Sequence, residues 1–600
     1  MSQNKDMIKP EEAGTLAGLF RERIRRTPDA IAFRQYDEGR EAWGDTTWLQ
    51  AGKELARWQA ALAKENLPPG SRVALMVRNC QQWVMYDQAA LSLGLVPVPL
   101  YVEDRAENVA YILKDSGAQV LLLMNDEQCR ELLATKDSLP GLKRIISMGQ
   151  VSPAIHDDRL MLLSSWLPAH AEEGEVYAAQ MDELATLVYT SGTTGRPKGV
   201  MLSHKNILSN AWAGLHSVEI FAGDVFLSFL PLSHTLERTI GYYLPVMAGS
   251  TIAYARSVLQ MAEDLLTIKP HVLVSVPRIF ERVHSRISAQ LENKSPLARG
   301  LFEKAIDVGW QRFEYTQGRS RWQPKQLLWP VLELLVAKKI QARLGGRIRV
   351  AISGGAALSP DIAHMFIGLG LNLYQGYGLT ETSPVLTVNR YDDNLPASIG
   401  TALPGIELSI GKNDELLAKG DNIMLGYWNL PEASAEIMQD GWLCTGDKAR
   451  IDELGHVFIT GRIKEIIVLA NGEKVPPADM EMAICLDPLF EQVMVVGEGK
   501  PYLSALVVLN PELWEKLTIE QGAVGTQEVL LQNDAMKALV KDRICKSLSQ
   551  FPGYAQIRQV TLDLQPWTIE NEMLTPKMSM KRKEITEHYT SDIGAMYEGH

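Results

Sequence analysis

The sequence predicts an α/β fold with a large N-terminal domain, made of two doubly wound sheets and a β-rich subdomain, followed by a small α+β C-terminal domain. Short apolar strands alternate with amphipathic helices before and after residue 190, and this alternation is typical of parallel sheets covered by helices. Beyond Gly461 the pattern changes to a compact mixture of strands and helices. We therefore expect domains at residues 1–462 and 463–600.

The first sheet is predicted from apolar runs that alternate with helical periodicity. The expected helices are Thr15–Arg26, Thr47–Asn66, Gln82–Leu93 and Arg105–Ser116, and the expected strands are Val73–Val77, Val96–Leu100 and Gln119–Met124.

The second sheet is predicted from the same alternation after a strand pair at Leu184–Tyr189 and Val200–Leu202. Ser203 is a good N-cap residue for the helix that follows this pair. The further helices expected are Asn206–Ser217 and Leu236–Met247, and the strands are Val225–Leu230, Thr251–Tyr254, His271–Val276, Ile348–Ser353 and Leu371–Tyr374.

Residues 281–344 have a helical pattern rich in tryptophan and basic residues, which predicts a helical insertion in the large domain. A β-rich part is expected over Ile399–Asp447. In the C-terminal domain we expect the turn Asn471-Gly472, helices Ala478–Leu486 and Asp534–Ser549, and strands Val493–Val496 and Leu503–Leu509.

Composition narrows the class of protein. With 46% hydrophobic and 22% charged residues, the chain is typical of a globular protein with a large core. The net charge of −12 argues against nucleic acid as a partner. Five cysteines without CxxC spacing indicate neither a disulfide framework nor a zinc site and favour the cytoplasm. No apolar signal region or membrane span is predicted, and peripheral contact with a membrane surface is compatible with the sequence.

The segment Thr190–Gly199, TSGTTGRPKG, has the composition of a polyphosphate site. Its hydroxyls, its glycines with free backbone N–H groups, and the charge of Lys198 are the donors and cation that phosphate oxygens require. It is not the Walker loop, because no helix follows the lysine directly. The alternative is a flexible tip of a surface hairpin. The residues that would contact phosphate are Thr190, Ser191, Gly192, Thr193, Thr194, Gly195 and Lys198.

This segment resembles the phosphate loop of the adenylate-forming superfamily, which includes acyl-CoA synthetases, luciferases and adenylation domains. The block Gln375–Pro384, QGYGLTETSP, resembles a second motif of that superfamily. The resemblance implies that Tyr377 lies against the purine, that Thr380 contacts the α-phosphate, and that Glu381 binds Mg²⁺ with Thr190 as the second contact. Residues implied in nucleotide binding around these are Gly355, Ala356, Gln375, Gly376 and Gly378.

Two further motifs follow in the order typical of the superfamily. Asp447 in CTGD matches the aspartate that accepts the ribose hydroxyls, and Arg462 in GRIKE matches an arginine at the ribose. Lys464 matches the hinge between the domains, and Gly472 lies in the loop expected on the coenzyme A side. A turn or a solvated charge is the structural alternative for these residues.

Two catalytic positions are implied near the acyl group. His234 in PLSH matches a residue beside the substrate carboxylate, although a lone histidine is often structural. A lysine near the C-terminus is also expected there, but the aligned position holds Ser579, and Lys577 and Lys581 flank it. Either lysine could replace the missing one.

The insertion and the segment Ser228–Arg238, SFLPLSHTLER, resemble the long-chain acyl-CoA synthetase branch. The resemblance implies an ATP- and Mg²⁺-dependent ligation of a fatty acid to coenzyme A through an acyl-adenylate. The alternatives are an acyl-AMP ligase that serves a carrier protein and a non-catalytic binder of acyl groups or nucleotides.

Overall fold

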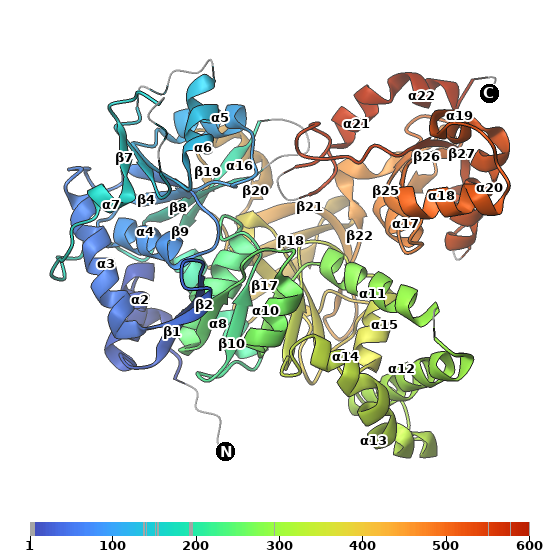
Figure 1. Cartoon of the computed structure of the whole chain (residues 1–600), viewed down its shortest axis with the longest axis horizontal. Helices are drawn as coiled ribbons and strands as arrows, with labels where there is room; N and C mark the ends of the chain where they lie inside the picture. The colour runs from blue at the N-terminus through green and yellow to red at the C-terminus, as the bar shows by residue number, and fades with distance from the viewer. Residues whose placement is uncertain are drawn as a thin grey trace.

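Six sheets organise the chain in this computed structural model, which describes residues 6–135, 139, 141–150, 152, 155–190, 196–292, 294–549, 551–575 and 578–598. The largest sheet has nine strands in the order β16-β15-β14-β13-β12-β10-β11-β1-β2. Its centre is parallel and both edges are antiparallel. Figure 1 shows it in the middle of the molecule, with the C-terminal part lying to one side of it.

The strands of the large sheet are short, and helices cover both faces. They are β1 (Ile31–Asp37), β2 (Ala42–Thr47), β10 (Val225–Ser228), β11 (Thr251–Tyr254), β12 (Val272–Ser275), β13 (Val350–Ser353), β14 (Leu373–Gly378), β15 (Val385–Val388) and β16 (Thr401–Ala402). Successive residues alternate between faces: Val272 and Val274 join one core cluster, whereas Leu273 joins another.

The second sheet is parallel and has five strands in the order β4-β3-β5-β6-β7. These are β3 (Arg72–Met76), β4 (Val96–Pro99), β5 (Val120–Leu123), β6 (Arg144–Ser147) and β7 (Leu160–Leu162). The helices that accompany the two sheets before residue 277 are α1 (Pro10–Ala13), α2 (Leu16–Arg26), α3 (Trp48–Ala63), α4 (Gln81–Ser92), α5 (Ala106–Ser116), α6 (Asp126–Ala134), α7 (Leu163–Trp166), α8 (His204–Ser217), α9 (Leu244–Ala248) and α10 (Met261–Ile268). The prediction of an α/β fold with two such sheets is confirmed.

Two local predictions need correction. The hairpin β1–β2 was not expected, because β2 (AWGDTT) is an edge strand without a buried apolar face. The helix expected at Leu236–Met247 is a π-helix, η1 (Glu237–Tyr243), that continues as α9. Leu244 N–H donates to the carbonyl of Thr239, five residues back, and Pro245 lacks the amide hydrogen that an α-helical bond to Gly241 would need.

A hairpin joins the two sheets. β8 (Leu184–Thr190) pairs with β9 (Lys198–Ser203), and β19 (Gly426–Tyr427) adds a third strand to this pair. The Ser203 hydroxyl accepts a hydrogen bond from Asn206 N–H, and Asn206 Oδ1 accepts one from Ser203 N–H, which confirms the expected N-cap of α8.

The insertion is helical, as predicted, and packs on α15 (Pro360–Gly368). It comprises α11 (Pro277–Glu292), α12 (Pro296–Thr316), the 3₁₀ turn η2 (Pro324–Leu328), α13 (Trp329–Leu332), the π-turn η3 (Glu333–Ala337) and α14 (Lys338–Arg343). The core between them contains Phe302, Trp329, Leu332 and Phe366.

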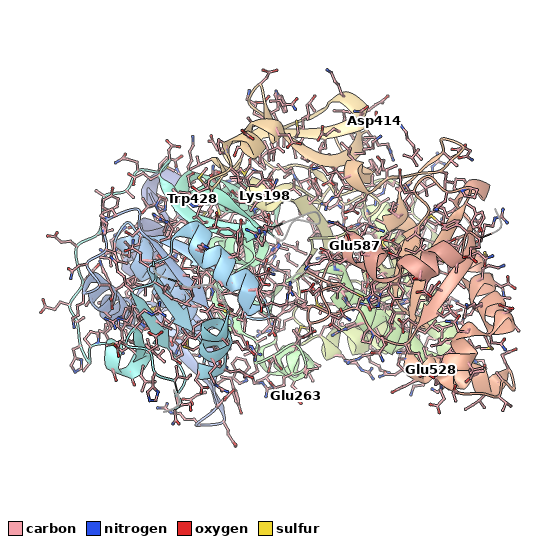
Figure 2. The ribbon with its side chains drawn as sticks, turned by 90° about the horizontal axis from the view of Figure 1, so that it is seen from above. Lys198, Glu263, Asp414, Trp428, Glu528 and Glu587 are labelled. Carbon is pink, nitrogen blue, oxygen red and sulfur yellow. The ribbon has the colours of Figure 1, made fainter. Side chains whose placement is uncertain are left out.

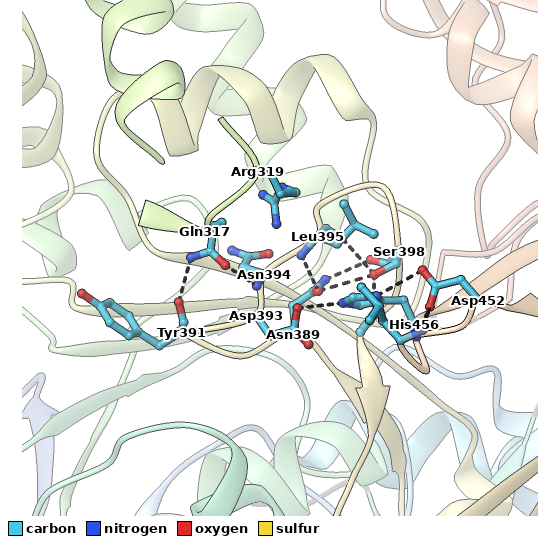
Figure 3. A network of polar contacts seen from close by, with 12 residues as sticks. Gln317, Arg319, Asn389, Tyr391, Asp393, Asn394, Leu395, Ser398, Asp452 and His456 are labelled. Atoms are coloured by element: carbon cyan, nitrogen blue, oxygen red, sulfur yellow. Dashed lines mark hydrogen bonds and ion pairs between the residues drawn. The ribbon is translucent and has the colours of Figure 1, made fainter. Parts of the chain in front are cut away.

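A polar network holds the C-terminal end of α12 against the loop that follows β15 (Figure 3). The Gln317 side chain accepts from Asn394 N–H at 2.8 Å and donates to the Tyr391 carbonyl at 2.9 Å. His456 extends the network, since its Nε2 lies 2.9 Å from Asp393. The end of α12 is therefore attached to the main body of the large part.

After β16 the chain forms a β-rich part and then a separate α+β part. The β-rich sheet contains β17 (Ile406–Ile410), β18 (Glu415–Gly420), β20 (Met438–Gln439), β21 (Trp442–Ile451) and β22 (Val457–Arg462), with α16 (Pro431–Ile437) beside it and the 3₁₀ turns η4 (Thr380–Thr382) and η5 (Lys412–Asp414) nearby. The remainder has its own apolar cores and comprises η6 (Ile463–Glu465), β23 (Ile467–Val468), β24 (Lys474–Val475), α17 (Pro477–Ile484), β25 (Phe490–Val496), β26 (Leu503–Leu509), α18 (Pro511–Glu520), α19 (Gln527–Gln532), α20 (Asp534–Ser547), η7 (Gly553–Ala555), β27 (Ile557–Asp563), α21 (Arg582–His588) and α22 (Thr590–Ala595).

Candidate active site

A cavity of about 380 Å³ lies at the carboxyl edge of the large sheet and continues beneath it. This edge is the usual place for ligands in open α/β sheets. The cavity has a polar end and an apolar end. The polar end is lined by Thr190, His234, Gly354, Gly355, Gly376, Tyr377, Gly378, Leu379, Thr380, Glu381, Thr445, Arg462, Thr575 and Ser579.

Strand β14 carries the Gly-Tyr-Gly motif to the cavity, so the motif is extended strand and not a turn. At Gly378 a Cβ atom would lie 1.7 Å from the carbonyl oxygen of Pro384, which only glycine avoids. Because glycine has no side chain, Gly376 and Gly378 present only backbone atoms at this edge of the cavity. Tyr377 lies between them and carries a bulky side chain.

Tyr377, Asp447 and Arg462 form a hydrogen-bonded group at the polar end. The Tyr377 hydroxyl donates to Asp447 Oδ2 at 2.6 Å, and Arg462 Nε donates to Oδ1 at 2.9 Å. Asp447 and Arg462 are cross-strand partners on β21 and β22, which explains why residues 15 apart meet. Burial and the neighbouring Asp447 carboxylate raise the pKa of Tyr377 well above its usual value, so its hydroxyl remains a donor.

A second polar group connects Glu381 to Lys198 through Tyr427. The Tyr427 hydroxyl donates to Glu381 Oε1 at 2.7 Å, and Lys198 Nζ lies 4.9 Å from the centroid of the Tyr427 ring. Tyr427 reaches this position because β19 pairs with β9, the strand that Lys198 begins. In Figure 2 Lys198 lies next to Trp428, the residue after Tyr427.

The structure describes only the two ends of the predicted phosphate loop. Thr190 ends β8 and is paired with Lys198 at the start of β9, and its hydroxyl donates to the Lys198 carbonyl at 3.5 Å. Ser191, Gly192, Thr193, Thr194 and Gly195 lie outside the described residues.

Three predicted residues around the polar end have different placements. His234 lines the cavity, and its Nδ1 accepts a hydrogen bond from Leu236 N–H at 3.1 Å, so a neutral His234 carries its proton on Nε2. Gln375 does not line the cavity. Its buried amide accepts from Leu358 N–H and donates to the Pro396 carbonyl, so its side chain positions the strand. Ala356 is exposed beside Gly355 and is not part of the lining either.

The C-terminal part contributes a wall of the cavity. Thr575 and Ser579 line it and hydrogen-bond to each other through their backbones. Lys577 lies outside the described residues. Lys581 is not part of the lining and lies near Asp104, whose buried carboxyl has a raised pKa that this lysine partly offsets.

The remaining two predicted residues lie away from the lining. Lys464 is exposed in η6, two residues after β22 ends. Gly472 is in an exposed turn with φ +88°, a conformation that favours glycine. Arg105 and Glu572 form an ion pair between the large part and the segment that carries Ser579.

The apolar end of the cavity runs along one face of the large sheet between α8 and η1. Val272 is level with Val350, and Gly354 lies four residues further along β13, so the cavity extends about 13 Å beneath the sheet edge. The apolar lining consists of Gly214, Val218, Ile220, Phe226, Leu236, Ile240, Leu244, Val272, Ile352, Pro384, Val385, Val388 and Leu403.

Two family models together match nearly all of the chain. Residues 20–428 match the model described as AMP-binding enzyme. Residues 464–600 match the model of the AMP-binding enzyme C-terminal domain. The chain belongs to the AMP-binding enzyme family. The predicted resemblance to adenylate-forming enzymes is thereby confirmed.

Relatives in this AMP-binding enzyme family are similar over most of their length. The long-chain-fatty-acid–CoA ligase FadD15 of Mycobacterium tuberculosis is 32% identical over 596 residues, which is 98% of this chain and 97% of that protein. The peroxisomal long chain acyl-CoA synthetase 6 of Arabidopsis thaliana is 29% identical, over 92% of this chain and 82% of that protein.

Solved structures confirm the adenylate-forming fold. The anthranilate CoA ligase AuaEII in complex with anthranoyl-AMP superposes with a TM-score of 0.73 at 18% identity, over 97% of this chain and 98% of that chain. A Mycobacterium tuberculosis fatty acyl CoA synthetase superposes with a TM-score of 0.63 at 21% identity, over 97% and 99%.

Two parts of this AMP-binding enzyme's cavity were not predicted from the sequence. Tyr427 was missed because it lies 46 residues after Glu381 in a stretch without a motif. The apolar lining was missed because its residues are scattered over several elements and loops and share only their apolar character.

Proposed function

We propose that this AMP-binding enzyme is an ATP-dependent long-chain fatty acid–CoA ligase that acts through an acyl-adenylate. A single cavity joins motif residues suited to a nucleotide with an apolar channel suited to an acyl chain, and this observation carries the proposal. The relatives named long-chain-fatty-acid–CoA ligase support it.

In the first step the fatty carboxylate would attack the α-phosphorus of ATP, forming acyl-AMP and releasing pyrophosphate. In the second, the thiolate of coenzyme A would attack the acyl carbonyl and release AMP. Positioning and electrostatics dominate such phosphoryl chemistry. Among the described residues no side chain is placed as a covalent nucleophile, and both steps proceed without one.

Tyr377, Asp447 and Arg462 are proposed to hold the nucleoside. Asp447 is buried and anchored by a donor on each carboxylate oxygen, and each oxygen keeps a lone pair for a ribose hydroxyl. The strand glycines Gly376 and Gly378, with Gly355 opposite, leave room for a flat base against the Tyr377 ring. Thr380 is proposed to contact the α-phosphate, and Gly192 and its neighbours in the loop to contact the outer phosphates.

Lys198 and His234 are proposed to act on the reacting groups. Lys198 begins β9 directly after the loop, where its charge can stabilise the departing pyrophosphate. His234 presents Nε2–H when neutral, a donor suited to the substrate carboxylate.

Glu381 and Thr190 fit a magnesium ion bound together with ATP. Mg²⁺ is usually held by one or two carboxylates plus phosphate oxygens and water. Within the described residues no group of three acidic, His or Cys side chains could hold a metal alone. Such an ion would neutralise phosphate charge, and the Tyr427 hydroxyl fixes the Glu381 carboxylate through Oε1.

The two parts of the chain are proposed to be domains, 1–462 and 463–600, that rotate about Lys464 between the two steps. Lys464 is exposed between β22 and the first elements of the C-terminal part, so a backbone change there breaks little packing. Gly472 would then approach the cavity with coenzyme A. Lys577 or Lys581 is proposed to supply the charge that Ser579 lacks.

A cytoplasmic location with peripheral membrane contact is also proposed, and nucleic acid is not expected as a partner. The five cysteines are free thiols, which suits a reducing compartment. Within the described part of the chain no helix has both the length and the apolar character needed to cross a bilayer.

The proposal is tested with purified protein, ATP, Mg²⁺, coenzyme A and a series of fatty acids. We expect pyrophosphate release that depends on the acid and acyl-CoA formation that depends on coenzyme A. Acyl-AMP without acyl-CoA would favour an acyl-AMP ligase that serves a carrier protein. No pyrophosphate with any acid would contradict the proposal and leave a non-catalytic binder.

A further inference from the structure

The tip of the helical insertion carries large apolar side chains that no part of the described chain covers. We define the insertion face as Trp322, Leu327, Leu328, Val331, Leu334 and Leu335, each at least 42% exposed. Leu327 is 72% exposed and Leu334 is 62% exposed. Single exposed leucines are ordinary, whereas six large apolar side chains within 14 residues form a patch that indicates an interaction surface.

The helical run that carries this face is apolar on two sides. One side packs into the protein through Trp329, Leu332 and Ala337. The residues of the insertion face recur every three or four positions between these and therefore point to solvent. A surface helix normally has a polar outer side, so the outer leucines are not explained by folding of this chain.

Basic residues surround the insertion face. Between Arg319 and Arg343 there are six basic residues and one acidic residue, Glu333, in a chain whose net charge is −12. The exposed ones nearest the face are Arg321, Lys325, Lys338 and Lys339. Exposed leucines surrounded by basic residues are typical of helices that lie in the interface of anionic bilayers.

The face is held in a fixed position at one end of the molecule. Figure 1 shows α13 at the tip of the insertion, on the opposite side of the large sheet from α5 and away from the C-terminal part. The base of the run packs on α12 and α15, and the Gln317 network fixes the end of α12 (Figure 3). A bilayer could therefore approach it without contacting the rest of the protein.

We propose that the insertion face docks this protein onto the surface of an anionic lipid bilayer. A second copy of this chain is a poorer occupant, because a two-fold contact would bring two basic clusters together. This proposal assigns a surface to the peripheral membrane contact proposed above, and an advantage in collecting membrane-dissolved fatty acid rests on the proposed ligase activity.

The proposal is tested by co-sedimentation of the full-length protein with lipid vesicles. Vesicles of phosphatidylcholine alone are compared with vesicles in which about a third of the lipid is phosphatidylglycerol. We expect binding to the anionic vesicles that weakens as salt is added. Wild-type protein that stays in the supernatant with anionic vesicles at low salt would overturn the proposal.

Variants distinguish lipid binding through the insertion face from non-specific adsorption of the protein to vesicles. Leu327→Gln with Leu334→Gln should weaken binding by about 10-fold or more, because two buried leucines are lost from the interface. Lys338→Glu with Lys339→Glu should remove the preference for anionic lipid. The matched control, Leu454→Gln with Val524→Gln, replaces side chains that are 78% and 95% exposed elsewhere and should bind like wild type.

Three further outcomes are decisive, and a fourth checks that the variant is folded. Equal binding by the leucine variant and wild type would overturn the proposal. Wild-type dimers that the leucine variant dissociates, with no vesicle binding, would assign the face to a second copy instead. Vesicle binding without acyl-CoA formation would leave the docking surface standing and contradict the ligase. Unchanged turnover of a short, freely dissolved acid by the leucine variant would confirm that the variant is folded.

Discussion

The two ends of the cavity are built in opposite ways. At the polar end, ionisable side chains are fixed by specific partners: Tyr377 and Arg462 hold Asp447, and Tyr427 holds Glu381. The apolar end is lined by hydrocarbon side chains and a glycine from a sheet face, neighbouring helices and loops. Under the proposed function, we expect the polar end to determine the rate of reaction and the apolar end to determine which acid reacts.

Loss of the positive charge at the polar end should have the largest effect. Lys198→Ala should lower turnover by roughly 10²–10³, because a preorganised charge at the departing pyrophosphate is lost. The preference among acids should not change. Pyrophosphate exchange is the measurement, and Lys205→Ala is the control, since Lys205 lies on the neighbouring helix and pairs with Asp421. Near-normal exchange in Lys198→Ala would show that the polar end does not work as proposed.

A side chain added at the apolar end should change the preference for acids of different chain length rather than the turnover of every acid. At Gly214 a Cβ would lie 3.0 Å from Leu244 Cδ1, inside the lining of the channel. Gly214→Leu should displace about three to four methylene groups of the substrate, or about 3 kcal/mol, which corresponds to a change of about 10² in kcat/KM for long relative to short acids.

Kinetics with a series of chain lengths tests this prediction. Gly214→Ala should give a smaller shift in the same direction, and His216→Leu, which is exposed on the same helix, should give none. An equal loss with all acids would mean that the substitution disturbs the fold or that the acyl chain lies elsewhere.

The contact between Tyr427 and Glu381 should have a moderate effect that is visible in the magnesium dependence. Tyr427→Phe removes one hydrogen bond to a carboxylate, worth about 1.5–3 kcal/mol, and should raise the Mg²⁺ concentration for half-maximal turnover by about 10-fold. Glu381→Ala should raise it further. A magnesium titration identical to that of wild type would remove Glu381 from the metal site.

Glu237 should affect stability rather than activity. It is buried on η1 beside the channel, and burial raises its pKa to about 8, while the hydroxyl of Ser228 partly offsets this. Because the folded state holds the proton more tightly than the unfolded state, this group stabilises the fold fully below pH 4.5, and that contribution is lost as pH rises toward 8.

Glu237→Gln, which resembles the protonated acid, should therefore raise stability near pH 8 by about 2–4 kcal/mol and flatten the pH profile. Thermal unfolding of both proteins at several pH values from about 5 to about 8 is the measurement. Parallel profiles would contradict the buried, protonated state of Glu237.

The sequence predicted the polar end far better than the apolar end. The phosphate loop and the block Gln375–Pro384 are contiguous, so their residue types are visible together. The channel residues Gly214, Phe226, Val272 and Val388 come from four elements and share only their apolar character. Helical periodicity also predicted an ordinary α-helix where the structure has η1. The residue types are the same in both kinds of helix, so they do not reveal the additional residue in each π-helical turn.

The polar end was not predicted completely either. Asp447 and Arg462 were expected to meet a nucleotide, but their mutual hydrogen bond depends on the register of β21 and β22, which the sequence does not state. Gln375 was expected at the nucleotide because it adjoins the motif, but its side chain is bonded to Leu358 N–H and to the Pro396 carbonyl.

Thr575 and Ser579 close one side of the cavity from a segment that Arg105 and Glu572 tie to the large part. That ion pair is partly exposed, so we expect added salt to weaken it. In the proposed reaction, faster release of AMP at higher ionic strength would show that this contact holds the product in the cavity.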